Sequence, residues 1–453
     1  MALVAIALAT IIAMAALSID IGTLYQAKAE AQRAADAAAL TAARLISISG
    51  LTGDPTNGSA DGTWAATCGG ATPYASQAAI KLAQATQNFV AGAPASTVTV
   101  TYGAGNAGGA ASDCSTLGAA FAINPTVTVT VKRINLPIFF AHIFSLFNST
   151  YSGISVSATA TAEAYNSSAS GSGGGSMIPV QPRCVKPWII PNRDPGNPSN
   201  PLFLNSFFVA TNNGSIGNPG IYPNGLIGEN FNLNADCTPG GAANACALIT
   251  PSPGYTGGVG GVLRYIPAQI SGTPAAAVVS GCSTTGYQAA IAGCDQNTVY
   301  ACGTANATNY DLTENPVYLT APTGDTATAA ACLTNYGTGG QDTLVTTPYP
   351  FKIEAGFNNP LVQKGVVFDN DVVTTSNSIV TIPIFDSPAS TATALPAQVT
   401  IVGFLQVFIN SVDTTTTGNV NVTVMNVSGC SNSATNPAVN GTSPVPVRLI
   451  TPP

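Results

Sequence analysis

Charged residues are scarce in this chain, and basic residues are the scarcer kind. Asp, Glu, Lys and Arg make up only 7% of its 453 residues, whereas they make up about 25% of a typical soluble domain. Thirteen basic residues against 20 acidic ones leave a formal net charge of −7. A nucleic-acid-binding surface needs clustered positive charge, so this composition excludes that class of function.

Histidine and the common catalytic motifs are also nearly absent. His142 is the single histidine, which excludes a His-rich metal centre and disfavours a Ser-His-Asp triad. We interpret it as a packing residue of the apolar stretch 136–147. The chain has no G-x-x-x-x-G-K-S/T phosphate-binding loop, no G-x-S-x-G nucleophile elbow and no C-x-x-C-H haem site. We therefore expect no enzyme, no cofactor and no metal.

Acidic side chains are the one weak exception to this expectation. Asp369 and Asp371 are two residues apart, and Glu354 and Asp386 lie on nearby segments. Such acids can hold Ca²⁺ or, at the right separation in a cleft, hydrolyse a glycosidic bond. Because Asp and Asn are ordinary turn residues, we favour solvated turns over either site.

Ten cysteines are present, and no two of them form a C-x-x-C motif. An even number without metal-ligand spacing favours disulfides over reduced thiols, and therefore an oxidising compartment such as the periplasm or the cell exterior. Their positions suggest the pairs Cys68–Cys114, Cys237–Cys246 and Cys184–Cys430. All ten are disulfide candidates: Cys68, Cys114, Cys184, Cys237, Cys246, Cys282, Cys294, Cys302, Cys332 and Cys430.

The chain opens with a long uncharged stretch, Ala2–Ile19. As a helix it would span about 27 Å, just enough for the core of a bilayer. No Lys or Arg precedes it, and the sequence after it continues the helical pattern until Gly50, so we favour a retained anchor over a cleaved signal peptide. Counting the downstream Lys28, Arg33 and Arg44 would place the body in the cytoplasm, but the cysteines favour the outside, and we follow them.

After the apolar stretch the helix becomes an alanine ladder with a seven-residue repeat. Small side chains at such spacing let a helix approach its neighbour closely. The charged residues lie mostly off this seam, where Glu30–Arg33 and Arg33–Asp36 form i,i+3 pairs. The neighbour is either the chain's own β structure or another subunit. The expected packing residues are Leu24, Ala27, Ala31, Ala34, Ala38 and Leu45, with Thr41 in the same rows.

The stretch Leu17–Ala43, LSIDIGTLYQAKAEAQRAADAAALTAA, closely resembles the N-terminal signature of TadG-like proteins of the Flp/Tad pilus assembly system. The resemblance implies an extracytoplasmic, membrane-anchored structural component that contacts other pilus proteins or copies of itself. Two features depart from related patterns: no D-x-S-x-S metal site of a von Willebrand A domain is present, and Ala5 stands where major pilins carry glutamate. The family-motif residues are Asp20, Gly22, Tyr25, Gln32 and Asp36.

The whole sequence predicts an α+β protein with four parts. Residues 1–48 form a long pilin-like helix, and residues 49–165 form a small α+β head with a helix near 74–90 and strands at 96–102, 126–131 and 152–164. Residues 166–176 (NSSASGSGGGS) read as a flexible linker. Residues 177–453 form a mainly β, sandwich-like or barrel-like domain, with strands at 206–210, 260–270, 315–320, 361–368, 378–385, 398–409 and 418–427.

Three functional hypotheses follow. The first is a TadG-like component anchored in the inner membrane with a periplasmic domain, or a subunit of a cell-surface filament. The second is a surface adhesin whose β domain binds a ligand through exposed aromatic residues such as Trp188 or Tyr222. The third, and weakest, is an extracytoplasmic hydrolase that uses the acids near Glu354 and Asp369.

Overall fold

The computed structural model describes most of the chain. The described residues are 2–53, 65–69, 73–85, 97–105, 110–118, 121–122, 124–136, 154–170, 179–196, 206–235, 238–239, 246–247, 261–271, 281–282, 285–303, 308–309, 325–347, 351–387, 398–415, 418–430, 439–441 and 443–450.

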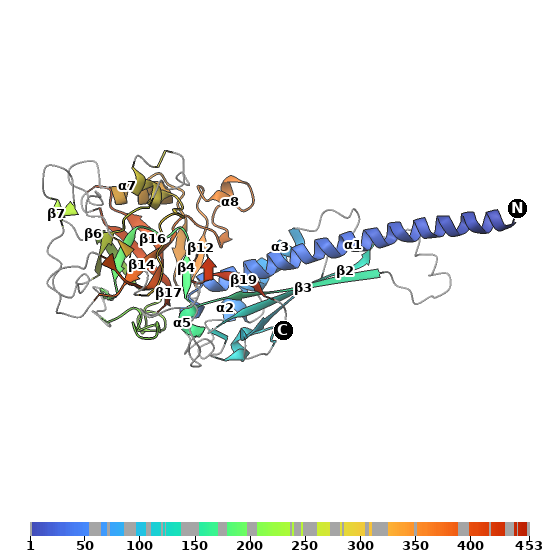
Figure 1. Ribbon diagram of the computed structural model, residues 1–453, viewed down its shortest axis with the longest axis horizontal. Coiled ribbons are helices and arrows are strands. Elements are labelled where there is room, and N and C mark those ends of the chain that lie inside the picture. The colour runs from blue at the N-terminus through green and yellow to red at the C-terminus, as the bar shows by residue number, and fades with distance from the viewer. Residues whose placement is uncertain are drawn as a thin grey trace.

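A single helix, α1 (Ala2–Ile48), forms the stalk of the molecule (Figure 1). Its 47 residues are rich in alanine and leucine, the strongest helix formers, and extend about 70 Å. The helix ends where the Ser49 amide donates to the Ile46 carbonyl and Gly50 takes a positive φ of 85°. This termination by glycine in a left-handed conformation is the usual one.

The head is an antiparallel sheet in the order β1-β2-β3-β19, covered on one face by α1 and α3. Valines 127, 129 and 131 of β2 point into the core, while Thr128 and Thr130 on the other face bond to Thr161 and Thr159 of β3. The alternation of valine and threonine in the sequence therefore correctly predicts which side chains of this strand face the core and which face away from it. The elements of the head are η1 (Leu51–Gly53), α2 (Ala65–Cys68), α3 (Tyr74–Ala85), β1 (Thr97–Gly103), η3 (Cys114–Leu117), β2 (Thr126–Leu136), β3 (Ile154–Ala164) and β19 (Val447–Ile450).

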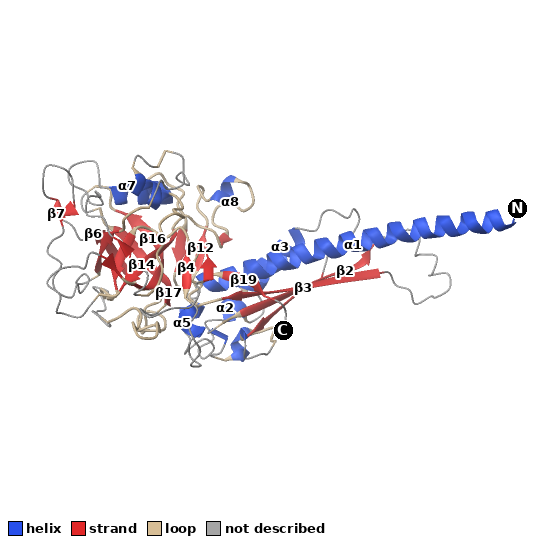
Figure 2. Cartoon of the chain, in the orientation of Figure 1, coloured by secondary structure: helices blue, strands red, loops and turns tan. Residues whose placement is uncertain are grey.

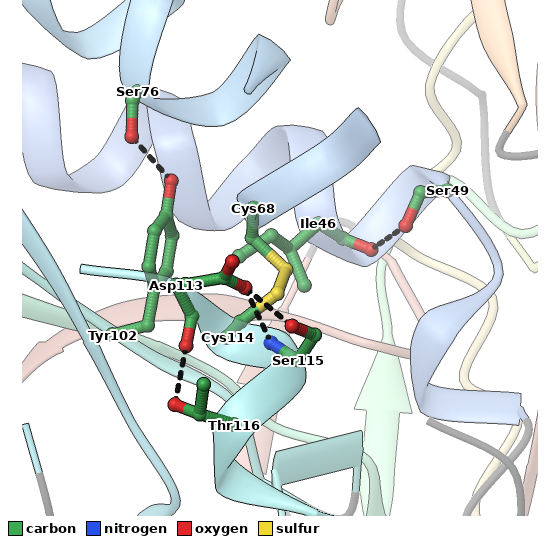
Figure 3. The surroundings of a disulfide bond; sticks show 9 residues. All are labelled: Ile46, Ser49, Cys68, Ser76, Tyr102, Asp113, Cys114, Ser115 and Thr116. Carbon is green, nitrogen blue, oxygen red and sulfur yellow. Dashed lines mark hydrogen bonds between the residues drawn. A yellow bond between two sulfur atoms is a disulfide. The ribbon is translucent and has the colours of Figure 1, made fainter. Parts of the chain in front are cut away.

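A disulfide between Cys68 and Cys114 ties α2 to η3 (Figure 3). Asp113 caps η3 by accepting a hydrogen bond from the Ser115 amide at 2.9 Å. The Tyr102 hydroxyl lies 2.6 Å from the Ser76 hydroxyl of α3. These contacts fix the loops of the head, and the cysteine pair is the one that the sequence suggested.

The second body is a closed barrel of six strands in the order β14-β16-β17-β6-β9-β5. Of the two arrangements expected from the sequence, sandwich-like and barrel-like, the structure has the barrel, and the mixed α+β class is confirmed. Two of the strand pairs, β6–β9 and β14–β5, are parallel. The barrel strands are β5 (Trp188–Pro191), β6 (Asn230–Ala235), β9 (Val262–Pro267), β14 (Ile379–Phe385), β16 (Ile401–Val412) and β17 (Val420–Gly429).

Short helices and small sheets surround the barrel (Figure 2). The strand expected at 361–368 is wrong, because α8 and a turn occupy that segment, and the strand expected at 206–210 is reduced to a bridge between Val209 and Ile216. The strand expected at 315–320 lies outside the described residues. The peripheral elements are α5 (Ser167–Ser170), β4 (Val180–Pro182), β7 (Thr238–Pro239), β8 (Cys246–Ala247), α6 (Gly286–Ala292), β10 (Thr308–Asn309), α7 (Asp325–Thr334), β11 (Thr343–Val345), β12 (Lys352–Glu354), α8 (Pro360–Gln363), β13 (Val372–Val373), β15 (Gln398–Val399) and β18 (Val439–Gly441).

Three disulfides join described cysteines in the loops and helices of the second body. The bonds are Cys184–Cys294, Cys282–Cys332 and Cys302–Cys430. The suggested Cys184–Cys430 pair is wrong, because each of these cysteines bonds to a partner in an intervening loop. Cys237 lies outside the described residues, so the suggested Cys237–Cys246 pair is not described.

The head and the barrel share more chain than the expected division at residues 166–176 allows. β19, from the end of the chain, pairs with β3 of the head, so the head is not confined to residues 49–165. Asn166 and Ser167, at the start of the expected linker, are buried, and their side chains bond to the Val427 and Gly429 carbonyls of β17. The start of that segment is thus a structured part of the junction.

Asn426 of β17 is the centre of this junction. Its amide donates to the Ser47 carbonyl at the end of α1 (3.1 Å) and to the Thr52 hydroxyl (2.7 Å), and the side chain is completely buried. The stalk therefore meets the barrel through a hydrogen-bonded contact that excludes water.

We expect Asn426→Ala to lower the free energy of unfolding by about 1–3 kcal/mol, because it leaves buried polar groups without partners. Urea denaturation of the purified full chain measures this change. Asn421→Ala is the matched control, since Asn421 lies on the same strand and bonds to Asn230 and Asn232 but is only half-buried. Equal losses in the two variants would contradict the special role of Asn426.

Candidate interaction site on the N-terminal helix

The first half of α1 projects beyond the head sheet and exposes its apolar side chains (Figure 1). Among the described side chains before Leu24, only Ala16 and Asp20 are buried, so apolar groups face outward around most of the helix. A soluble helix rarely does this, because exposed apolar area is costly. The exposed large side chains are Leu3, Val4, Leu8, Ile11, Ile12, Met14, Leu17, Ile19, Ile21 and Tyr25.

Within the described part of the chain, α1 is the one helix long and apolar enough to cross a membrane, over the range Thr10–Ile48. Its most apolar window is only 18% buried, which distinguishes it from the core helix of a soluble protein. Length and composition therefore agree with the anchor expected for Ala2–Ile19.

The second half of α1 packs on the chain's own head. Ala27, Ala31, Ala34 and Ala38 are completely buried, Leu45 is nearly so, and Leu24 is half-buried. The opposing surface consists of β2 and β3 and of Ala75, Ala79 and Ala83 on α3. Alanine facing alanine brings the two helix axes close together. Of the two neighbours considered for the seam, the structure places the chain's own head against it.

A buried ion pair fixes the helix on the sheet. Arg133 of β2 donates to the Glu30 carboxylate at 2.7 Å, and the two side chains are 0% and 7% exposed. The expectation that Glu30 lies off the seam and pairs with Arg33 is wrong, because the sheet supplies a closer cation in a buried site. Lys28 adds a hydrogen bond to the Ser157 carbonyl on β3.

The family-motif residues divide between the two halves of α1. Gln32 donates to Asp36 of the same helix at 2.8 Å and to the Thr159 carbonyl of β3 at 3.2 Å, so Gln32 helps to hold the helix on the sheet. Asp20 is 2% exposed. Tyr25 is 74% exposed, and nothing lies within 4 Å of a Cβ built on Gly22. These last two positions are open to contacts outside the chain.

We expect Arg133→Met to destabilise the protein by about 3–5 kcal/mol, because it leaves the Glu30 charge buried without this partner, and Glu30→Leu to cost a similar amount. The double variant should recover most of the loss. Thermal and urea unfolding measure these changes. Arg448→Gln is the control: the Arg448–Glu163 pair joins β19 to β3, but Arg448 is 47% exposed, so its loss should cost less than about 1 kcal/mol. A large penalty that persists in the double variant would contradict this account.

The acids considered for catalysis or Ca²⁺ do not converge. Glu354 bonds to Lys352 at 2.8 Å, Asp371 accepts the Phe368 amide in an exposed turn, and Asp369 contacts Asn370. Among the described residues, no three His, Cys, Asp or Glu side chains are grouped to hold a metal. The aromatic residue expected to line a ligand groove, Trp188, is completely buried in the barrel core, whereas Tyr222 is half-buried. His142 lies outside the described residues.

Two carboxyl groups that the sequence did not single out meet inside the barrel wall. Asp194 and Glu229 are 0% and 2% exposed, and each acts on the pKa of the other. Burial raises the pKa of both groups, and the negative charge of Asp194 raises that of Glu229 further. Neither group reaches solvent, so we interpret the pair as structural.

The raised pKa of Glu229 links stability to pH. A buried acid with a raised pKa binds more protons in the folded than in the unfolded state, so the free energy of unfolding should fall as the pH rises above 4.5, the ordinary glutamate pKa, toward the raised value. We expect Glu229→Gln to flatten this dependence and to stabilise the protein at alkaline pH. Melting temperatures of the natural chain and of the variant across a pH series measure this dependence. The exposed Asp369→Asn variant serves as a control, and its profile should follow that of the natural chain.

Residues 1–45 match the family model described as "Putative Flp pilus-assembly TadE/G-like". The match covers nearly all of α1, both the exposed apolar half and the half that packs on the head. It confirms the family resemblance of this part of the chain and indicates a component of a Tad system. No curated protein and no solved structure matches the chain.

Proposed function

We propose that this protein is a structural component of a Tad-type pilus or secretion apparatus, anchored by the first half of α1 and displaying its barrel outside the cytoplasm. The observation that carries the proposal is the division of α1. One half exposes apolar side chains around most of its circumference, and the other half buries its alanine face on the chain's own head. The family match spans both halves.

The disulfides support the location. Four of them join described cysteines on both bodies of the molecule. Such bonds form and persist in oxidising compartments. A periplasmic domain held by the inner membrane and a domain on a cell-surface filament both satisfy this requirement.

The exposed half of α1 suits two variants of this role. Apolar side chains all around a helix suit lipid, as in an envelope assembly factor, and they equally suit a filament core built from copies of the same helix. Mass spectrometry of purified filaments separates the variants, because only a subunit will be recovered in stoichiometric amounts.

The structure gives the adhesin hypothesis less support than the sequence did. One of its two named aromatic residues, Trp188, is buried. We propose no enzymatic activity for the chain.

Anchoring is tested by placing charge in the apolar half. We expect the double variant Leu8→Arg/Ile12→Arg to leave the membrane fraction, because each arginine in the bilayer core costs about 2.5–3.5 kcal/mol. Partition after alkaline carbonate extraction measures it.

The matched control is Tyr25→Arg/Gln26→Arg, which adds the same charge to exposed positions beyond the apolar stretch and should stay in the membrane fraction. Membrane release of both variants alike, or of neither, would argue against the proposed anchor.

A further inference from the structure

A cavity of about 520 Å³ lies where the end of α1, the strand β19 and the barrel meet. α1 contributes Leu40 and Arg44, the barrel contributes residues of β14 and β16, and Lys186 enters from the segment before β5. The volume lies within the range of small-molecule pockets. Nothing in the function proposed above uses it.

The charge of this cavity is unusual for the chain. Only 13 of the 453 residues are basic, yet two of them, Arg44 and Lys186, line the same cavity, and no acidic residue lines it. The remaining polar groups are hydroxyls and amides, from Thr374, Thr375, Ser376, Asn377, Thr381 and Gln406. In a protein with net negative charge, such a lining attracts anions.

Arg44 is available to a ligand. Its side chain is half-buried and makes no hydrogen bond or ion pair with any described residue. By contrast, Arg133 and Arg448 each bond to a carboxylate. Placing a guanidinium in a partly enclosed site without a counter-charge is unfavourable, and burial accordingly lowers its pKa.

Lys186 adds a second, deeper cation. It is 5% exposed and donates to the Gly293 carbonyl at 2.7 Å, which leaves further donors of its ammonium group for a ligand. The acid whose charge acts on it is Asp295, and the Asp295 carboxylate already accepts hydrogen bonds from the Asn297 amide and from the Thr298 amide and hydroxyl. Burial lowers the pKa of Lys186 to about 7 despite Asp295.

We propose that this cavity, which we call the Arg44–Lys186 pocket, binds a small hydroxylated oxyanion whose carboxylate or phosphate group lies between the two cations and whose hydroxyls face the Thr374–Asn377 loop. A charge-assisted pair with a guanidinium and an ammonium is the strongest form of hydrogen bonding that these side chains offer. The ligand bridges α1 and the barrel, so it also reinforces the junction at Asn426.

The position of the pocket selects among sources of such an anion. Arg44 follows Ile19 by 25 residues, or about 37 Å of helix. The headgroups of a membrane that holds Ala2–Ile19 are therefore out of reach, and the ligand is an anion in solution or on a sugar polymer.

Isothermal titration of the purified full chain with D-glucuronate and with inorganic phosphate tests the proposal. Glucose and chloride at matched ionic strength are the controls. We expect saturable binding of at least one of the two oxyanions and none of glucose. Arg44→Gln should weaken that binding by about tenfold, the loss of one charge-assisted contact. Binding of chloride at equal strength, or no saturable binding of either oxyanion, would overturn the proposal.

Arg33→Gln is the matched control, because Arg33 is an exposed arginine on the same helix outside the pocket, and its affinity should equal that of the natural chain. Lys186→Gln should also weaken binding, and its melting temperature and circular dichroism will show whether this variant folds. If Lys186→Gln does not fold, the affinity of the Arg44→Gln variant decides whether the pocket binds the anion.

Affinity for glucuronate, which stays ionised, should rise as the pH falls from about 8 to about 6, because Lys186 gains its proton in this range. Affinity unchanged in Arg44→Gln would place the anion elsewhere.

Discussion

The close approach of α1 to the head sheet is the contact on which the rest of the structure depends. Alanines on α1 and α3 leave almost no side chain between the helices, and the buried Glu30–Arg133 pair fixes the helix along the sheet. An apolar alanine surface alone would tolerate sliding by a turn. A buried charge pair does not tolerate such sliding, because any other register would leave two buried charges without their partners.

This fixed register determines where both ends of α1 lie. Toward the N-terminus, the sheet ends and the apolar half projects beyond it (Figure 1). Toward the C-terminus, Ser47 and Thr52 reach Asn426 of the barrel, and Arg44 enters the pocket that Lys186 also lines. The exposed apolar half, the junction and the pocket are thus all placed by the one register of α1 on the head sheet.

The barrel is joined to this rod by more than a linker. β19 completes the head sheet after the chain has formed the barrel, and Asn166 and Ser167 pack against β17 on the way in. Because the chain leaves the head and returns to it in this way, the head and the barrel are joined at two points. In the role proposed above, such coupling would let a load on the barrel pass directly to the exposed apolar half of α1.

The sequence by itself determined the local features: the continuous helix to Ile48, the apolar and alanine halves, the strands β1 to β3 and β14 to β17, and the family of the first 45 residues. Each of these depends on periodicity or composition within one segment, which is written directly in the residues. Only the tertiary structure decided the partner of Glu30, the disulfide pairs of Cys184 and Cys430, the closure of the barrel and the return of β19. The Asp194–Glu229 pair and the meeting of Arg44 with Lys186 belong to the same group. These features join residues 35 to more than 280 positions apart, and no local pattern records which distant side chain will be buried beside another.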